Sequence, residues 1–358
     1  MKSPATGPVI DRAGPGLGGI GLGRYVLVRF LLILPTVFVL TTLVFFLMRV
    51  IGDPITAAFG GRLGAAELSR RVHAAGYDRP VLAQYAEYLG QVARGDFGAA
   101  LTDHQPIGVI LRTYGAATLE LVAYSLVVAL ALSPALGIVA ARLRDRGADA
   151  GLRVLAILGY TAPVFFVGLL LKLVFAIRLG WLPVNGRLST VNEIGLQERG
   201  LESGIYLLDA IRAGSGSMIA DVLRHAVLPA VALGLLSTGI FLRLFRTSLI
   251  GTLGSDYVLA GRSRGVSELR LTTRHALRPA LVPIMTVMGL QVASLLSGAV
   301  LTETTFEWKG LGFELTRYLQ ARDYVAVQGV VMALAVIVAV VNFLVDVVAA
   351  LIDPRIRY

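Results

Sequence analysis

Six long apolar segments constrain the fold of this chain more than any other feature. A helix that crosses a bilayer needs about 20 mostly apolar residues, because the hydrocarbon core offers no water to the backbone. Six segments meet this requirement, and none shows the alternating pattern of a membrane β-strand. They cover residues 25–50, 116–140, 154–177, 226–250, 279–301 and 324–352. The chain is therefore predicted to be an all-α membrane protein with six transmembrane helices.

The composition supports this class. Hydrophobic residues make up 56% of the chain and charged residues 16%, whereas soluble domains are about 45–50% apolar and about 25% charged. The first apolar segment is too long for a signal peptide, and no small-residue cleavage motif follows it. We therefore predict an uncleaved first span, a disordered lead-in over residues 1–23 and a transmembrane domain over residues 24–358. The chain has no cysteine, which excludes disulfides and cysteine-ligated metal sites.

The distribution of charge predicts the orientation in the membrane. The net charge is +10, which alone could indicate nucleic acid or a membrane surface. If the N-terminus is cytoplasmic, the segments on that side hold 17 basic and six acidic residues, whereas the outer segments hold 15 of each. Because basic residues accumulate on the cytoplasmic side of membrane proteins, both the N- and C-termini are predicted to be cytoplasmic. Topology then explains the basicity, and no nucleic-acid partner is needed.

Two long segments are predicted to lie on the outer side. The outer segment 51–115 contains an amphipathic stretch that predicts a helix between Pro80 and Gly95, with Tyr85 and Tyr88 on its apolar face. That helix either lies at the membrane interface or packs on the spans from outside. The outer excursion 178–224 is polar and glycine-rich, with one short helix expected near residues 205–211.

The loop over residues 251–278, on the predicted cytoplasmic side, reads as two short helices. Ser255 or Asp256 is placed to cap the first helix, and Gly265 is placed to end it in a left-handed conformation. Ser267 is placed to cap the second. A pair of short, arginine-rich helices makes a rigid projection that fits an acidic groove on a partner. The alternative is that the arginines only fix the orientation and contact anionic membrane lipid.

The same loop resembles a known family. Residues Asp256–Pro283 read DYVLAGRSRGVSELRLTTRHALRPALVP, which is similar to the conserved cytoplasmic loop of permease subunits in bacterial ABC importers. Further segments resemble the dipeptide/oligopeptide, B-type branch of that family in the expected order. They are GDP at 52–54, RGDFG at 94–98, GWLPVNGR at 180–187, TETTFEWKGLG at 302–312 and DPRIR at 353–357. The chain departs from the pattern at Gly261, where alanine is commoner, and in a longer excursion over residues 189–216, which could alter contact with the solute receptor.

The resemblance implies a fold, a location and partners. The fold is that of a type I ABC importer permease in the bacterial inner (plasma) membrane. A second permease subunit would complete the pore, two ABC ATPase subunits would dock on the loops, and an extracytoplasmic solute-binding protein would deliver the solute. Gly265 would turn the coupling helix, Arg262 and Arg264 would contact the ATPase, and His275 would support the return into the fifth span. The ATPase-coupling residues carried over by position are Asp256, Tyr257, Ala260, Arg262, Arg264, Gly265, Ser267 and His275.

The chain is not expected to be an enzyme. Its three lysines are Lys2, Lys172 and Lys309, and none follows a glycine, so the phosphate-binding P-loop motif is missing. ATP and magnesium are therefore expected on the partner ATPases, with no cofactor or metal in this chain. An intramembrane enzyme is a remote alternative, because the four histidines form no metalloprotease motif.

Two further alternatives concern the energy source and the solute. Glu120, Lys172 and Asp346 lie within apolar segments, and intramembrane ionisable residues are typical of ion- or proton-driven secondary transporters. The structural interpretation is that each is paired with a neighbouring group, and no inverted repeat is visible. Among solutes of the family, a peptide is favoured over nickel, because no cluster of metal ligands lines a span. Import of nickel or of glutathione is the alternative.

Overall fold

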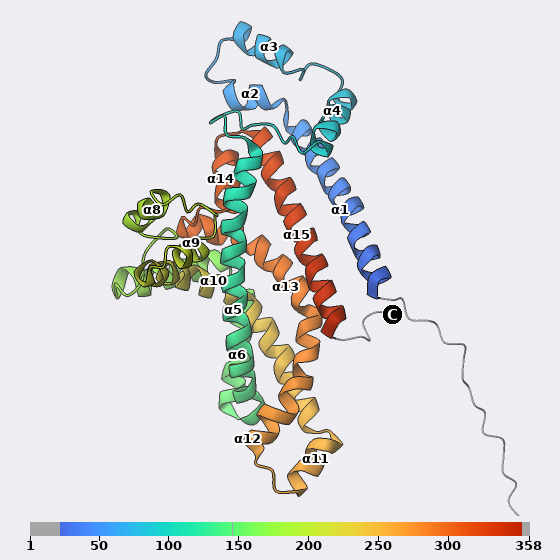
Figure 1. Cartoon of the computed structure of the whole chain (residues 1–358), viewed down its shortest axis with the longest axis vertical. Coiled ribbons are helices and arrows are strands. Elements are labelled where there is room, and N and C mark those ends of the chain that lie inside the picture. Colours follow the sequence, from blue (N-terminus) through green and yellow to red (C-terminus); the bar gives the residue numbers. More distant parts are fainter. Residues whose placement is uncertain (1–21, 145, 353–358) are drawn as a thin grey trace, which may run out of the picture.

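The fold is a bundle of long helices with smaller helices at both ends (Figure 1). The structure, a computed structural model, describes residues 22–144 and 146–352. Five helices are long and apolar enough to cross a membrane, and a bent helix pair brings the number to six when it is counted as one span. The five are α1 (Leu22–Ile51), α5 (Ile107–Arg142), α10 (Gly216–Leu253), α13 (Leu277–Phe306) and α15 (Tyr324–Ile352). The prediction of a six-span helical membrane protein is confirmed.

The predicted lead-in mostly lies outside the described residues. Residues 1–21 and the C-terminal residues 353–358 are not among them. The first helix begins at Leu22, so residues 22 and 23, the last two of the predicted lead-in, are helical.

The third predicted span is bent rather than straight. It consists of α6 (Gly147–Thr161), α7 (Val164–Leu171) and a π-helical continuation, η1 (Lys172–Arg178). The helix axis bends by 109° between Gly147–Thr161 and Val164–Arg178. Ala162, between them, has an extended backbone with φ −69° and ψ 136°. A residue before proline is driven out of the helical region by the proline ring, so Pro163 explains the break.

Small residues let α10 pack closely against its neighbours. A Cβ atom at Gly234 would lie 2.7 Å from the backbone oxygen of Ser125 in α5, and one at Gly239 would lie 2.4 Å from that of Ala156 in α6. Small residues are typical of helix contacts in membranes, where packing rather than water exclusion holds helices together. Phe241, also on α10, is fully buried in this region. The centre of the bundle is thus the contact of α10 with α5, α6 and α13.

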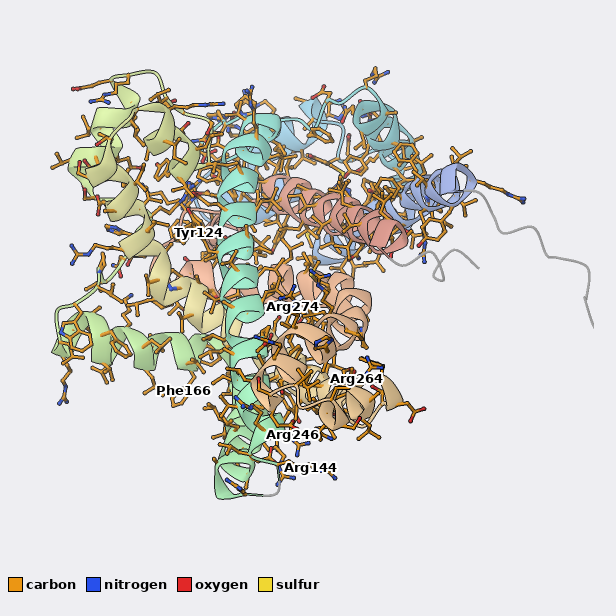
Figure 2. The ribbon with its side chains drawn as sticks, turned by 60° about the horizontal axis from the view of Figure 1, so that its bottom comes forward. Tyr124, Arg144, Phe166, Arg246, Arg264 and Arg274 are labelled. Carbon is orange, nitrogen blue, oxygen red and sulfur yellow. The ribbon has the colours of Figure 1, made fainter. Side chains whose placement is uncertain are left out.

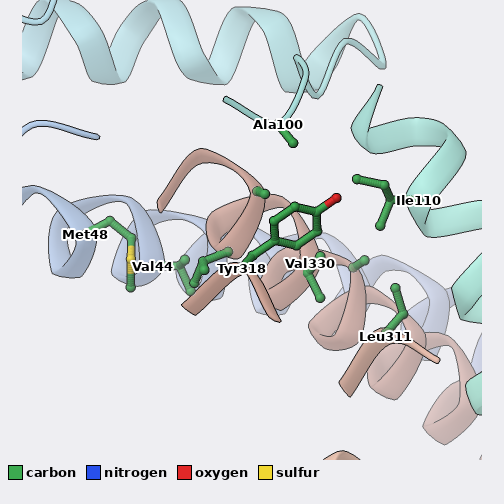
Figure 3. Close-up of a cluster of buried hydrophobic side chains, with 10 residues drawn as sticks. Val44, Met48, Ala100, Ile110, Leu311, Tyr318 and Val330 are labelled. Atoms are coloured by element: carbon green, nitrogen blue, oxygen red, sulfur yellow. The ribbon is translucent and has the colours of Figure 1, made fainter. Parts of the chain in front are cut away.

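A second buried cluster holds one end of the bundle together (Figure 3). Tyr318 on α14 (Leu311–Gln320) packs with Ile110 of α5 and Val330 of α15, and Val44 and Met48 of α1 belong to the same cluster. Above it lie α2 (Pro54–Phe59), α3 (Ala65–Ala74) and α4 (Val81–Ala93) (Figure 1).

The predicted amphipathic helix is α4, and its aromatic face packs on the spans. The Tyr88 ring stacks on Phe45 of α1 at 5.4 Å between centroids, and the Tyr85 hydroxyl lies 2.6 Å from the Thr42 hydroxyl. Of the two alternatives, the observed one is therefore that α4 packs on the spans. Leu82, in the first turn of α4, is 72% exposed and takes no part in this contact.

The excursion between η1 and α10 forms a small packed unit. It contains α8 (Thr190–Gln197), which the sequence analysis did not predict, and α9 (Tyr206–Arg212), close to the predicted short helix. Leu188, Leu196 and Val222 form a buried cluster within it. Figure 1 shows α8 and α9 to the side of the bundle, and α11 and α12 at the end opposite to α2–α4.

Candidate functional site

The candidate functional site is the segment between α10 and α13, here called the α11–η2 segment (Ser255–Ala276). It comprises α11 (Asp256–Ser263), the three-residue helix α12 (Glu268–Arg270) and the π-helical turn η2 (Leu271–Ala276), which continues directly into α13. The two predicted helices are therefore present. Ser255 and Ser267 occupy the predicted N-cap positions with extended backbones. Neither side chain makes a capping hydrogen bond, however, and Ser255 Oγ instead donates to the carbonyl of Thr252.

Gly265 ends α11 in the predicted left-handed conformation. Its φ is +78°. The Val266 N–H donates to the Gly261 carbonyl at 3.2 Å, and the Gly265 N–H donates to the Arg262 carbonyl at 3.0 Å. These two bonds are those of a Schellman motif, which satisfies the last carbonyls of a helix. Glycine reaches this region without a steric penalty, so the turn between α11 and α12 depends on Gly265.

Buried side chains fix the segment to the bundle. Val258 of α11 and Leu271 of η2 are buried, as is Thr272. A Cβ atom at Gly261 would lie 2.8 Å from Cδ2 of Leu271. The unusual glycine at this position thus allows α11 to pack closely against η2, and the projection is held at a defined angle.

All the predicted coupling residues lie on the exposed surface of this segment, as the residue-by-residue exposure shows. These are Asp256, Tyr257, Ala260, Arg262, Arg264, Gly265, Ser267 and His275. Figure 2 shows Arg264 in the lower part of its view together with Arg144 and Arg246, and Arg274 nearer the middle. Two exposed apolar side chains, Leu259 and Leu269, lie among the arginines. Neither leucine was predicted as a site residue, although a leucine next to arginines in a polar loop is a usable signal.

Arg262 already has a partner within the chain. Its guanidinium binds the Glu268 carboxylate through two hydrogen bonds, of which Nη2–Oε2 measures 3.1 Å. The hydrogen bond from Arg262 lowers the pKa of Glu268. This pair joins the end of α11 to the start of α12 across the Gly265 turn. Arg264, by contrast, is exposed and makes no ion pair with any residue in the described ranges.

The ionisable groups within the apolar segments are engaged by neighbours. Lys172 Nζ donates to the Thr305 carbonyl at 2.9 Å, and Asp346 lies 3.4 Å from Arg29 of α1. Glu120 Oε2 accepts a hydrogen bond of 2.6 Å from Arg187 Nη2. These contacts support the interpretation that all three residues have a structural role, each paired with a neighbouring group.

The Glu120–Arg187 pair ties the excursion to α5. Both side chains are buried, and Glu120 Oε1 also accepts hydrogen bonds from Tyr124 Oη at 2.8 Å and from the Leu207 N–H at 2.9 Å. The Arg187 guanidinium stacks on the Tyr206 ring at 4.0 Å from its centroid. A buried ion pair needs such additional bonds to offset its desolvation.

A second buried carboxylate, Glu303, organises the start of α14. Glu303 Oε2 accepts from the backbone N–H groups of Gly312 at 2.7 Å and Phe313 at 3.0 Å, and Oε1 accepts from Thr118 Oγ1 at 2.6 Å. Trp308 Nε1 donates to the Ala117 carbonyl at 2.9 Å. The motif TETTFEWKGLG therefore joins α13, α14 and α5. Within residues 22–144 and 146–352, no three histidine or carboxylate side chains gather in a way that could hold a metal ion.

The bundle of long apolar helices defines the class of this protein as a polytopic membrane protein. Comparison with known proteins shows the family: the chain belongs to the binding-protein-dependent transport system inner membrane components, whose family model matches residues 133–358. It is thus a bacterial inner-membrane transport protein.

Curated relatives cover nearly the whole chain. It is 37% identical to the di/tripeptide transport system permease protein DppB of Pseudomonas aeruginosa, over 91% of this chain and 96% of the relative. It is 35% identical to the dipeptide transport system permease protein DppB of Escherichia coli K12, over 94% of this chain and 99% of the relative. The same-named protein of Haemophilus influenzae is 37% identical over the same shares. The resemblance to peptide permeases is therefore confirmed.

Proposed function

We propose that this chain is one of two pore subunits of an ATP-driven importer of di- and tripeptides, and that the α11–η2 segment seats a separate ATPase. The observation that carries the proposal is the Gly265 turn. It fixes a short, exposed, arginine-bearing helix at one end of a membrane bundle whose relatives are named as dipeptide permeases. A rigid projection that continues into α13 would convert ATPase closure into movement of that helix.

The remaining partners follow from the family description and from the fold. A binding-protein-dependent system includes a solute-binding protein, which would approach the end formed by α2–α4, opposite to α11. A second permease subunit would complete the pore. The domain assignment is part of the same proposal: residues 51–115 and 178–224 lie outside, and residues 251–278 lie in the cytoplasm.

Single-cysteine labelling tests this orientation directly, since the chain has no cysteine of its own. Ser263→Cys, on the exposed end of α11, is expected to react with a membrane-impermeant maleimide only after the cells are permeabilised. Ser69→Cys, on α3 at the opposite end, is expected to react in intact cells. Labelling of Ser263→Cys in intact cells would contradict the proposed topology.

Charge reversal tests the ATPase-docking role. In the double variant Arg262→Glu/Arg264→Glu, both positive charges on α11 become negative, and we expect the yield of co-purified ATPase to fall roughly tenfold. Import of a labelled dipeptide into vesicles that carry the complete importer should fall in parallel in this variant. In the wild type, excess nickel or glutathione should not compete with the dipeptide for import.

Two controls separate docking from folding. Glu268→Gln removes the partner of Arg262 but keeps both positive charges, so it reports the contribution of the internal pair alone. Arg62→Glu/Arg70→Glu makes the same change of charge at the opposite end and should leave ATPase yield unchanged. Wild-type ATPase yield in the Arg262→Glu/Arg264→Glu variant would refute the docking role.

A further inference from the structure

A cavity of about 180 Å³ lies between α6 and α10, toward the end of the bundle that carries the α11–η2 segment. Apolar side chains from both helices, including Ala156 and Leu242, line it together with Gly239. The close approach of Gly239 to the Ala156 carbonyl brings the two helices together there. Arg153 and Arg243, with Arg246, line the same cavity. The cavity is thus apolar with a basic rim.

Three arginines line the cavity, and among the described residues the carboxylate that pairs with two of them is Asp149. Arg246 donates two hydrogen bonds of 2.7 Å to the buried carboxylate of Asp149. Arg153 approaches the same carboxylate only to 3.9 Å, and its side chain is 56% exposed. Arg243 is exposed and forms no ion pair within the part of the chain that the structure describes. Two exposed arginines, Arg153 and Arg243, therefore line the cavity together with the Arg246–Asp149 pair.

The residues around the cavity indicate that it lies at the membrane surface. Val154, Leu155 and Leu158 of α6 are each more than half exposed, and α6 is half of the bent membrane span. Exposed apolar side chains on a membrane-spanning helix are suited to contact with the hydrocarbon of lipid. Arg243 and Arg246 lie within about the last three turns of α10, where long basic side chains reach the headgroup region.

We propose that this cavity binds an anionic phospholipid, with the headgroup phosphate on Arg153 and Arg243 and the upper part of one acyl chain along Ala156 and Leu242. Guanidinium groups recognise phosphate oxygens well, and basic pockets between membrane helices are typical sites for acidic lipids. The volume is too small for a whole lipid, so the remaining chain lies along the exposed face of α6. A free phosphate would use the guanidiniums but leave the apolar lining empty, and this favours the lipid.

Native mass spectrometry of the purified importer, with the subunits that it retains, tests the proposal. Phosphatidylglycerol and phosphatidylcholine with the same acyl chains are added separately, and bound lipid is counted. We expect the wild type to retain phosphatidylglycerol preferentially. In Arg153→Gln/Arg243→Gln, the apparent affinity for phosphatidylglycerol should fall roughly ten- to thirtyfold, with phosphatidylcholine unchanged.

Matched variants make the result specific to the cavity. Arg270→Gln/Arg274→Gln removes the same charge from exposed positions of the α11–η2 segment and should keep phosphatidylglycerol binding intact. Thr247→Trp fills the cavity from an exposed lining position and keeps both guanidiniums, so it should also weaken lipid retention. Equal retention of the two lipids by the wild type, equal losses in the two arginine pairs, or full displacement by inorganic phosphate would each overturn the proposal.

Discussion

Peptide import is expected to fall about tenfold in the variant Gly265→Val, with the protein still present in the membrane. A β-branched residue in the left-handed region costs roughly 1–2 kcal/mol, which is a factor of about five to thirty in the population of the native turn. A Cβ atom at Gly265 would meet nothing within 4 Å, so the effect comes from the backbone alone. Uptake of a labelled dipeptide and the ATPase activity it stimulates are the measurements.

Two further substitutions serve as controls for Gly265→Val. Gly265→Asn should retain most of the uptake, because asparagine tolerates the left-handed conformation better than other residues do. Gly251→Val places the same side chain at an exposed glycine of α10 that has open space and no positive φ, and it should be close to wild type. Normal uptake by Gly265→Val would show that the α11–η2 segment does not need this turn.

The variant Arg187→Leu is expected to lose about 3–5 kcal/mol of stability, because it leaves the Glu120 carboxylate buried without its cation. The Arg187 hydrogen bond to the Gly204 carbonyl at 2.7 Å is lost as well. Thermal unfolding of the purified chain in detergent, and its amount in the membrane, measure the effect. Peptide import should fall only as far as the amount of folded protein falls.

A double-mutant cycle isolates the pair. Glu120→Leu/Arg187→Leu should be more stable than Arg187→Leu alone, since neither charge then remains buried. Arg199→Leu removes an exposed arginine from the same excursion and should change stability little. If Arg187→Leu unfolds at the wild-type temperature, the pair does not hold the excursion to α5.

The spans were predictable because about 20 consecutive apolar residues in lipid have one stable conformation. The ends of the spans were less predictable. Helix α10 begins at Gly216 rather than near 226, because the polar residues of its first turns are bonded by the excursion: Asp221 Oδ2 accepts from Ser189 and Asn192. The break at Pro163 was visible as a proline, yet its 109° bend depends on how α6 and α7 pack on α10.

The candidate site was predictable where local geometry decides it. Gly265 was recognisable as a helix terminator, since helices commonly end with a glycine in the left-handed conformation. The pairing of Arg262 with Glu268 was not recognised, and the Glu120–Arg187 pair joins residues 67 positions apart. Long-range pairs of this kind depend on how the excursion folds back on α5, which no local pattern specifies.

The π-helical turn η2 has a consequence for how the chain tolerates changes of length. A π-turn accommodates about one residue more than an α-turn, and η2 runs from the buried Leu271 to the buried Ala276, directly before α13. Deleting one residue within Leu271–Ala276 would convert the turn to ordinary α-helix and leave the phase of α13 intact. An insertion or deletion further along α13 would instead rotate every later side chain by about 100° relative to its neighbours.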